Sequence, residues 1–265
     1  MARAVLVEDP DDPRVAPYRD IRERDLVGRE GLFIVEGEVV LRTLMRSGRA
    51  APLSVLIDAK RLVSLADVIA QLPAETPVYA ASQAVIDAIA GFHLHRGILA
   101  IGRKEDDRDA NALLAAAPER AVVVVLFGLA NHDNMGGVFR NAAAFGAHAV
   151  LLDPDCCDPL YRKAIRVSVG ATLVTPYARV PGGVGAIDLL ERHGFIPLAL
   201  TPKGAESLNA LPPPSRAAVL LGTEGQGLAP EVMARARTVR IEMTGPMDSL
   251  NVAVTSGLAL HRLAS

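Results

Sequence analysis

The first of three polar stretches that could bind a ligand contains Asn134, a Gly136-Gly137 pair and Arg140. It follows Val122 to Phe127, an apolar run that predicts a buried strand. Glycines let the main chain approach a ligand, and Arg140 shares a helix face with Asn134 or Gly136. Open α/β sheets bind ligands in the loops that follow their strands. The stretch therefore predicts a ligand site, although a strand-to-helix turn with a surface arginine explains the same residues.

The second stretch, Leu221 to Leu228, has three glycines in six residues directly after an apolar strand pattern. Glu224 stands between the glycines, where a carboxylate can orient a substrate hydroxyl or a cofactor amine. The spacing is not G-x-G-x-x-G, and no acidic residue is placed to bind a ribose as in a Rossmann site. A flexible turn is the alternative reading of these residues.

The third stretch lies near the C-terminus and combines a strand pattern, a turn and a helix start. Ile241 to Met243 predicts a buried strand end, and Gly245-Pro246 predicts a turn. Ser249 or Asn251 can cap the helix that is predicted by the apolar positions Leu250, Val254, Leu258 and Leu260 to Leu263. The exposed amides of a helix start bind ligands readily. Capping alone is the simpler explanation of the two polar residues.

Strand and helix patterns alternate along the chain and indicate where these stretches are positioned. Half of the 265 residues are hydrophobic, which is ample for one or two domains. Residues 1–104 predict a small α/β domain, 105–119 a polar linker, and 120–265 an α/β domain with a mostly parallel sheet and helices on both faces. The expected strands are 32–35, 53–57, 78–80, 97–101, 122–127, 149–153, 173–176, 197–201, 217–221 and 239–243, with a helix near 39–45.

Composition narrows the possible functions. A formal net charge of −2 argues against a wholesale polyanion binder, and 4% aromatic residues without Trp argue against an aromatic base-stacking platform. Cys156 and Cys157 are adjacent, which makes an intrachain disulfide unlikely on geometric grounds and offers no zinc-ligand spacing, so no metal site is expected. No apolar run approaches the roughly 18 residues of a membrane span. We expect a soluble, cytoplasmic protein.

An arginine cluster near the N-terminus suggests a surface that faces phosphate groups. It comprises Arg14, Arg19, Arg22, Arg24 and Arg29. The alternative is a solvated helix whose arginines pair with the interspersed acidic residues Asp20, Glu23, Asp25 and Glu30. Both readings remain open at this stage.

The three stretches, in this order and separation, resemble the signature motifs of the SpoU (TrmH-like) family of RNA ribose 2'-O-methyltransferases, within the SPOUT superfamily. The first motif is Asn134-x-Gly136-x-x-x-Arg140, the second Leu221-Gly222-x-Glu224-Gly225-x-Gly227-Leu228, and the third Ile241-x-Met243 with Ser249-Leu250-Asn251-Val252-Ala253. Residues 162–171 also look like a family segment. Residues 15–101 are similar, more loosely, to the family's substrate-binding domain, so that residues 1–104 are expected to bind RNA through Arg19, Arg22, Arg24 and Arg29.

The resemblance implies a deep trefoil knot at the C-terminus, S-adenosylmethionine as cofactor and a homodimer formed through the knotted domain. The cofactor would be held at Gly222, Ile241, Met243 and Leu250. The partner would be structured RNA, with ribosomal RNA favoured over transfer RNA because a separate N-terminal domain suits a larger substrate. Asn131-His132 and Glu242 depart from the residues that many members have there, and His132 reads as a loop histidine rather than a general base.

The implied reaction is attack of a ribose 2'-hydroxyl on the methyl group of the sulfonium, which requires alignment of two reactants and removal of one proton. The resemblance makes Arg140 the activating residue. A guanidinium with a pKa above about 12 is a poor base, so we expect it to hold a phosphate and stabilise the developing alkoxide. Asn134, Glu224, Ser249 and Asn251 complete the expected catalytic set.

Two other classes of function fit parts of the sequence. One is a non-catalytic RNA-binding protein with a degenerate knot that acts in ribosome assembly, against which the complete catalytic set argues. The other is a nucleotide-dependent enzyme on an unknotted Rossmann-like sheet, which the glycine spacing of the second stretch disfavours.

Overall fold

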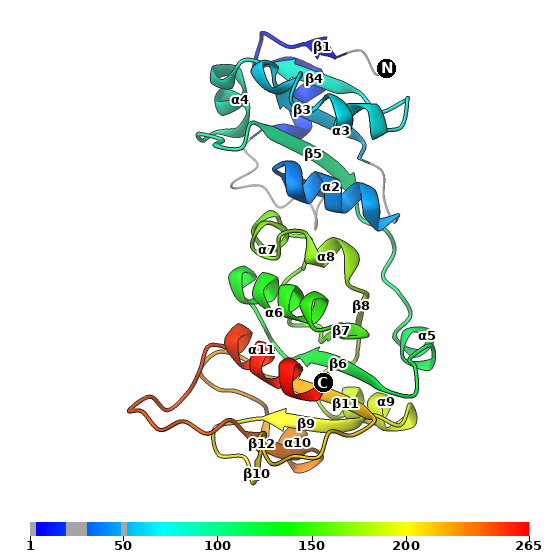
Figure 1. The fold of residues 1–265 in the computed structure, drawn as a ribbon, viewed down its shortest axis with the longest axis vertical. Helices are drawn as coiled ribbons and strands as arrows, with labels where there is room; N and C mark the ends of the chain where they lie inside the picture. Colours follow the sequence, from blue (N-terminus) through cyan, green and yellow to red (C-terminus); the bar gives the residue numbers. More distant parts are fainter. Residues whose placement is uncertain (1–3, 20–30, 49–51, 265) are drawn as a thin grey trace. The chain divides into compact units, whose positions relative to one another are not determined.

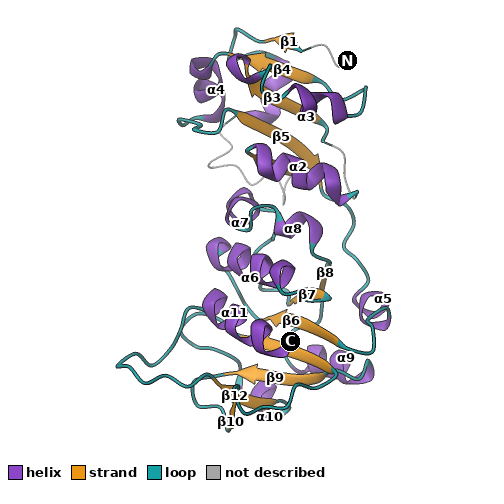
Figure 2. Ribbon diagram, in the orientation of Figure 1, coloured by secondary structure: helices purple, strands orange, loops and turns teal. Residues whose placement is uncertain are grey.

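The computed structural model describes residues 4–19, 31–48 and 52–264 of the chain, and it divides into two compact units. Unit 1 comprises Met1–Glu105 with Leu160–Val174, and unit 2 comprises Asp106–Pro159 with Thr175–Ser265. Each unit is a sheet with helices packed against it, as Figures 1 and 2 show. The predicted α/β class is confirmed.

The sheet of unit 1 has the strand order β1-β4-β3-β5-β2. β4 runs parallel to both β1 and β3, whereas β5 is antiparallel to both β3 and β2. In chain order the elements are β1 (Val5–Leu6), η1 (Pro13–Tyr18), β2 (Leu32–Glu36), α2 (Glu38–Ser47), β3 (Ser54–Asp58), η2 (Ala59–Arg61), α3 (Ala66–Gln71), β4 (Val78–Ala81), α4 (Gln83–Ala90), β5 (Ile98–Arg103), α7 (Arg162–Val167) and α8 (Ala171–Val174).

Alternate residues of the unit 1 strands enter two hydrophobic cores because side chains of a strand point to opposite faces. Val55 and Ile57 of β3 face one core, which contains buried residues of α2 and α3. Leu56 faces the other core, which contains residues of η1 and α4. Helices thus cover both faces of this small sheet.

The segment that begins at Leu160 belongs to unit 1, although its place in the sequence predicts the second domain. Leu160, Ile165 and Leu173 are buried in the core that contains α2 and β2. The predicted strand over 173–176 is therefore wrong, because Leu173 and Val174 are part of helix α8 and strand β8 begins only at Tyr177. Gly170 approaches Thr43 of α2 closely, with only 3.1 Å between an added Cβ and the Thr43 methyl group, so a larger residue there would force Thr43 to shift.

The sheet of unit 2 has the strand order β10-β12-β9-β11-β6-β7-β8, and every pairing in it is parallel. In chain order the elements are α5 (Ala110–Ala115), β6 (Ala121–Leu126), α6 (His132–Ala144), β7 (Ala149–Leu152), β8 (Tyr177–Arg179), α9 (Val184–Arg192), β9 (Ile196–Leu200), β10 (Glu206–Ser207), β11 (Arg216–Leu221), α10 (Pro230–Ala234), β12 (Arg237–Arg240) and α11 (Val252–Leu263). The predicted mostly parallel sheet is confirmed.

Two helix layers cover the unit 2 sheet. α5, α9 and α10 bury apolar side chains against Val123, Val125 and Leu220 on one face. α6 and α11 lie side by side and pack on strands β6, β7 and β11, as Figure 1 shows. Within the described ranges, no helix is both long enough and apolar enough to cross a membrane.

Two boundaries in unit 2 differ from those predicted. The expected strand over 239–243 ends at Arg240, because its last pairs are Val239 with Leu200 and Arg240 with Ser207, where the neighbouring strands β9 and β10 stop. Residues Ile241 to Met243 are therefore a loop rather than a buried strand end. The expected linker over 105–119 contains helix α5, whose Ala110 and Leu114 are buried in the unit 2 core.

Candidate active site

Helix α6 begins directly after strand β6 and positions the first motif. The Asn131 side chain caps the helix, because its Oδ1 accepts hydrogen bonds from the main-chain N–H groups of Asp133 (2.8 Å) and Asn134 (3.3 Å). This cap fixes the helix start, so Asn134 lies in the first turn with its side chain buried. Arg140 follows almost two turns later and is exposed.

Helix α11 begins at the third motif, and Asn251 is its cap. Asn251 Oδ1 accepts from the main-chain N–H of Ala253 (2.8 Å) and Val254 (3.3 Å). Its Nδ2 donates to Asn134 Oδ1 at 2.8 Å, which joins the starts of α6 and α11. Residues 117 positions apart in the sequence are thus directly bonded. Ser249, the other expected cap, instead donates to the Asp248 carboxylate at 3.2 Å.

The two helices approach closely along the turns that follow. A Cβ added to Gly137 would lie 2.6 Å from the Ala253 Cβ, so only glycine fits between them. Asn141 Nδ2 donates to the Ala253 carbonyl (2.6 Å) and to Ser256 Oγ (2.9 Å). Ser256 is fully buried, so these bonds form in a low-dielectric contact where they are electrostatically strong. α6 and α11 therefore act as one rigid support for both motifs.

The second motif forms a tight loop after β11. Main-chain bonds join Thr223 and Gly227 in both directions, at 3.2 and 3.0 Å. A Cβ on Gly222 would lie 2.2 Å from the Gly227 carbonyl carbon, so the loop closes only with glycine there. Gly225 and Gly227 have φ of +92° and +74°, a region that disfavours other residues. The exposed Glu224 is thereby presented on a constrained loop.

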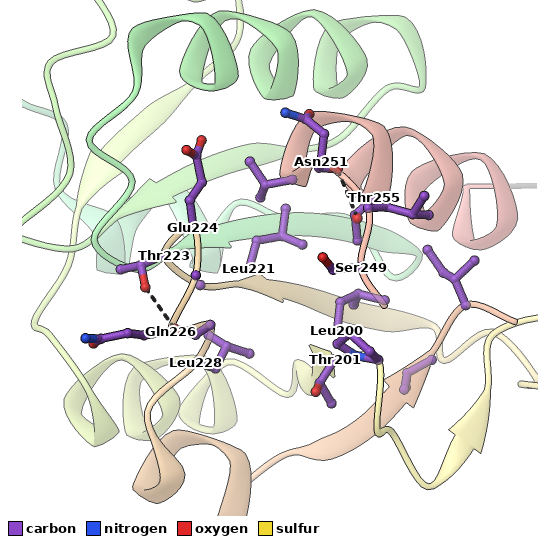
Figure 3. Close-up of a pocket in the computed structure, with 18 of the residues that line it drawn as sticks. Leu200, Thr201, Leu221, Thr223, Glu224, Gln226, Leu228, Ser249, Asn251 and Thr255 are labelled. Atoms are coloured by element: carbon purple, nitrogen blue, oxygen red, sulfur yellow. Dashed lines mark hydrogen bonds between the residues drawn. The ribbon is translucent and has the colours of Figure 1, made fainter. Parts of the chain in front are cut away.

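A cavity of about 520 Å³ lies where the second and third motifs meet. Figure 3 shows Glu224 and Asn251 on one side of it and Leu200 and Thr201 on another. Its lining includes all four residues predicted to hold a cofactor, Gly222, Ile241, Met243 and Leu250, together with Ser249. The volume is within the usual range for small-molecule sites. The carboxyl ends of the parallel strands β9 and β11 supply part of the wall, as expected for an open α/β sheet.

Comparison with known proteins shows the family to which this chain belongs. Residues 121–261 match the family model described as the SpoU rRNA Methylase family. The chain belongs to this family. A relative from Mycobacterium bovis, called an uncharacterized tRNA/rRNA methyltransferase, is 39% identical over 96% of this chain and 89% of its own. A 23S rRNA (guanosine-2'-O-)-methyltransferase from Coxiella burnetii is 29% identical over 64% of this chain and 69% of its own.

The fold agrees with this assignment. The crystal structure of an AdoMet-bound rRNA methyltransferase from Sinorhizobium meliloti aligns with a TM-score of 0.82 and 21% identity, covering 98% of this chain and 97% of that one. The resemblance of the three motifs to SpoU signatures is thus confirmed, and this SpoU-family chain is an RNA methyltransferase.

Asn134 and Arg140 do not line the cavity. Asn134 contacts the third motif through its hydrogen bond with Asn251. Arg140 has no hydrogen-bond or ion-pair partner among the described residues. Arg140 follows Gly136 by four positions and Gly137 by three, so it lies on the flank of α6 near the contact with α11. An exposed guanidinium there is available to a substrate phosphate.

Sequence reasoning missed several lining residues outside the three motifs, among them Leu200, Thr201 and Thr255. Leu200 and Thr201 stand at the carboxyl end of strand β9, next to β11 in the sheet, and that position was the available signal. Thr255 lies one turn after Asn251 and donates to its carbonyl oxygen at 3.1 Å. Helix periodicity places it beside the cap.

The two cysteines are free thiols in unit 2. Desolvation by burial raises the pKa of Cys156 to about 12 and that of Cys157 to about 11, so neither is a thiolate at neutral pH. Nowhere in the described ranges do three or more His, Cys, Asp or Glu side chains gather in a way that would hold a metal ion.

Of the arginines expected to bind RNA, Arg22, Arg24 and Arg29 lie outside the described residues. Arg19 donates to the main-chain carbonyls of Pro10 (3.3 Å) and Asp12 (3.2 Å), so it ties together its own loop. Arg14 pairs with the Asp12 carboxylate and lowers its pKa to about 2. Arg14 and Arg19 thus have partners within residues 10–12, whereas Asp20, Glu23, Asp25 and Glu30, the acidic partners expected from the sequence, lie outside the described residues.

Proposed function

We propose that the protein transfers the methyl group of S-adenosylmethionine to a ribose 2'-hydroxyl of ribosomal RNA. The observation that supports this most is the hydrogen bond between Asn134 and Asn251, which brings the first and third motifs together. Asn251 also lines the cavity, as do the residues of the second motif. The names of two relatives, a tRNA/rRNA methyltransferase and a 23S rRNA (guanosine-2'-O-)-methyltransferase, are consistent with it.

The cavity suits S-adenosylmethionine in size and in chemistry. Leu221, Ile241 and Leu250 supply apolar contacts, and the glycine loop supplies main-chain polar groups beside them. The polarizable thioether of Met243 lines another part of the cavity. When bound, the cofactor supplies an electrophilic methyl group on a sulfonium. The chain's own residues then have to orient the acceptor hydroxyl and stabilise the charge that develops on it.

Arg140 is the residue that we assign to this stabilisation. A guanidinium is a poor general base, so Arg140 binds the phosphate next to the acceptor ribose and offsets alkoxide charge rather than removing a proton. Asn134 and Asn251 hold α6 and α11 in register. Glu224 and Ser249 line the cavity's open side as exposed hydrogen-bonding groups that position the ribose.

Two further features of the proposal concern topology and assembly. We infer that the loop over 241–251 is threaded into a trefoil knot. The inference is supported by the cavity, which this loop lines together with the loop over 222–228.

We also infer a homodimer through unit 2. Val254 and Leu258 lie four residues apart on α11 and are 51% and 44% exposed, which makes an apolar stripe on the surface of this helix.

Mapping of 2'-O-methyl positions in RNA from cells with and without the gene tests this function. The proposal expects one ribose in ribosomal RNA to lose its methyl group when the gene is deleted and to regain it when the wild-type gene is restored. Loss of a methyl group from transfer RNA alone would correct the substrate. Loss of a base methyl group, with all riboses unchanged, would refute the proposed reaction.

A further inference from the structure

A loop of unit 1 presents two histidine rings in a fixed arrangement. The loop joins α4 to β5, and its Leu94 is fully buried and anchors it to the core. The Asp87 carboxylate accepts from the Leu94 main-chain N–H (2.9 Å) and contacts His93 Nδ1 at 2.6 Å. His93 and His95 pack edge to face, with ring centroids 4.6 Å apart. Both rings are exposed although their loop is anchored.

Three arginines surround this loop. The Arg96 side chain crosses Gly37 so closely that an added Cβ would lie 2.7 Å from its Cδ. Arg61 donates a hydrogen bond to the Arg96 carbonyl oxygen. Arg162 of α7 lies 5.0 Å from the centre of the Phe92 ring. We name the group the His95 patch; it comprises Arg61, Phe92, His93, His95, Arg96 and Arg162.

The arginines of the His95 patch differ in whether an acidic side chain pairs with them. Arg162 pairs with the Glu36 carboxylate at 2.5 Å, and Arg61 pairs with Glu38 at 3.0 Å. These pairs offset two of the three guanidinium charges. Among the described residues Arg96 has no acidic partner, and it is exposed. A free guanidinium therefore stands beside two exposed aromatic rings.

We propose that the His95 patch binds an unpaired segment of the RNA substrate. Arg96 contacts a backbone phosphate, and an unpaired base stacks on the His95 ring, which packs edge to face against His93, itself held by Asp87. Aromatic rings and guanidinium planes are the groups on which splayed RNA bases stack, whereas a fully paired duplex offers no free base face. The proposal rests on the proposed function, because it assumes that the substrate is RNA.

The segment that carries Arg162 strengthens the assignment to RNA. α7 contains Arg162, Lys163 and Arg166, and it packs on β2 of unit 1 although it lies in the sequence range of the family's methylase model. Unit 1 thus gains three basic side chains, of which Arg162 lies over Phe92 of the loop. Cationic side chains beside stacking rings suit a polyanion with exposed bases.

The test measures binding of two fluorescent RNA probes to the full-length protein over a range of salt concentrations. One probe is a hairpin with a single-stranded adenosine loop, and the other is the same stem as a blunt duplex. The wild type is expected to prefer the hairpin by about fivefold or more. His95→Ala should abolish that preference without changing duplex affinity. Arg96→Ala should reduce the slope of log Kd against log salt by about 0.7, the value of one single-strand phosphate contact.

Arg192→Ala is the matched control, since Arg192 is an exposed arginine on α9 of unit 2. It should leave both the preference and the slope unchanged. The patch is refuted if the wild type shows no hairpin preference, if both patch variants bind as the wild type does, or if Arg192→Ala reduces the slope equally.

Calorimetric titration with S-adenosylmethionine separates this proposal from the proposed function. Both patch variants should bind the cofactor as the wild type does, which also shows that they are folded. A wild type that methylates RNA, with patch variants that bind both probes normally, would refute the patch and leave the methyl transfer standing. A wild type that binds no S-adenosylmethionine would refute the proposed function.

Discussion

Arg140 is the residue on which the proposed chemistry depends most. It is exposed on α6, outside the cavity wall, so its removal should leave the cofactor site intact. Arg140→Ala is expected to lower kcat by about 100-fold or more, as when a charge-stabilising donor is removed elsewhere. Arg140→Lys should recover part of the rate, because the charge remains while the planar fork is lost.

The measurement pairs a methyl-transfer assay on ribosomal RNA with calorimetric titration of S-adenosylmethionine. Unchanged cofactor affinity in Arg140→Ala supports the assigned role. A variant that no longer binds the cofactor, or that transfers methyl groups at the wild-type rate, would show that Arg140 has another function.

Asn251 has two separable roles, as cap of α11 and as partner of Asn134. Serine also caps helices well but is too short to reach Asn134, so Asn251→Ser should retain stability within a few tenths of a kcal/mol while lowering activity. Asn251→Ala should lose both roles and destabilise the fold by about 1 kcal/mol. Urea unfolding and the methyl-transfer rate measure the two effects. Equal activity in Asn251→Ser and the wild type would contradict a role for the Asn134–Asn251 bond.

At the scale of elements, the glycine loop after β11 is the feature most sensitive to one added carbon. Gly222→Ala places a Cβ 2.2 Å from the Gly227 carbonyl carbon, so the loop must open. Overpacking of about 1 to 3 kcal/mol corresponds to a loss of about 5- to 150-fold in S-adenosylmethionine affinity. Gly245→Ala is the control, because nothing lies within 4 Å of its added Cβ. Calorimetry on both variants tests this; equal affinities would show that the loop does not bind the cofactor.

The contact between α6 and α11 offers a second test with an internal rescue. Gly137→Ala should destabilise the protein by about 1 to 3 kcal/mol, because its Cβ would lie 2.6 Å from that of Ala253. Adding Ala253→Gly removes the clash and should restore part of the stability and most of the activity. Urea unfolding of the single and double variants measures the coupling. Additive losses, with no rescue, would mean that this contact does not set the helix register.

The elements show what the sequence could and could not predict. Apolar, β-branched runs such as Val122 to Phe127 predicted strands correctly, because a buried strand and its periodicity are local properties. Ile241 and Met243 also suggested a strand, but a strand ends where its neighbours stop, which is a property of the sheet. Likewise, the position of Leu173 in a helix depends on the unit 1 core into which it packs.

The candidate site likewise combines residues that local sequence patterns predict with contacts that only the tertiary fold determines. The motif residues and the Asn251 cap were predictable, because side-chain caps and glycine turns are local. The bond from Asn251 to Asn134 was not, since it joins residues 117 positions apart. The assignment of α7 to unit 1, and with it the His95 patch, depends on tertiary packing that no local pattern encodes.

At the scale of the whole molecule, the structure changes how the N-terminal unit should be tested. Removal of residues 1–104 would leave Leu160, Ile165 and Leu173 without the core that buries them. Such a deletion would therefore expose apolar surface, and a loss of RNA binding would not report on RNA contacts alone. Point substitutions on the surface of unit 1 avoid this problem.

The proposed dimer is also a property of the whole molecule. The double variant Val254→Glu, Leu258→Glu places two charges on the apolar stripe of α11, and it should convert a dimer into a monomer in sedimentation experiments. Val63→Glu is the control, because Val63 of unit 1 is 89% exposed and outside the stripe. A double variant that sediments like the wild type would contradict a dimer interface on this helix face.

The most direct measurement of the central claim uses S-adenosylmethionine with a deuterated methyl group. The purified protein is incubated with ribosomal RNA from cells that lack the gene, and the RNA is digested to nucleosides for mass spectrometry. The heavy methyl group is expected on the ribose of one nucleoside with the wild type, and on none with Arg140→Ala. A heavy methyl group on a base, or equal ribose labelling by the variant, would contradict the assignment of this site to ribose 2'-O-methylation.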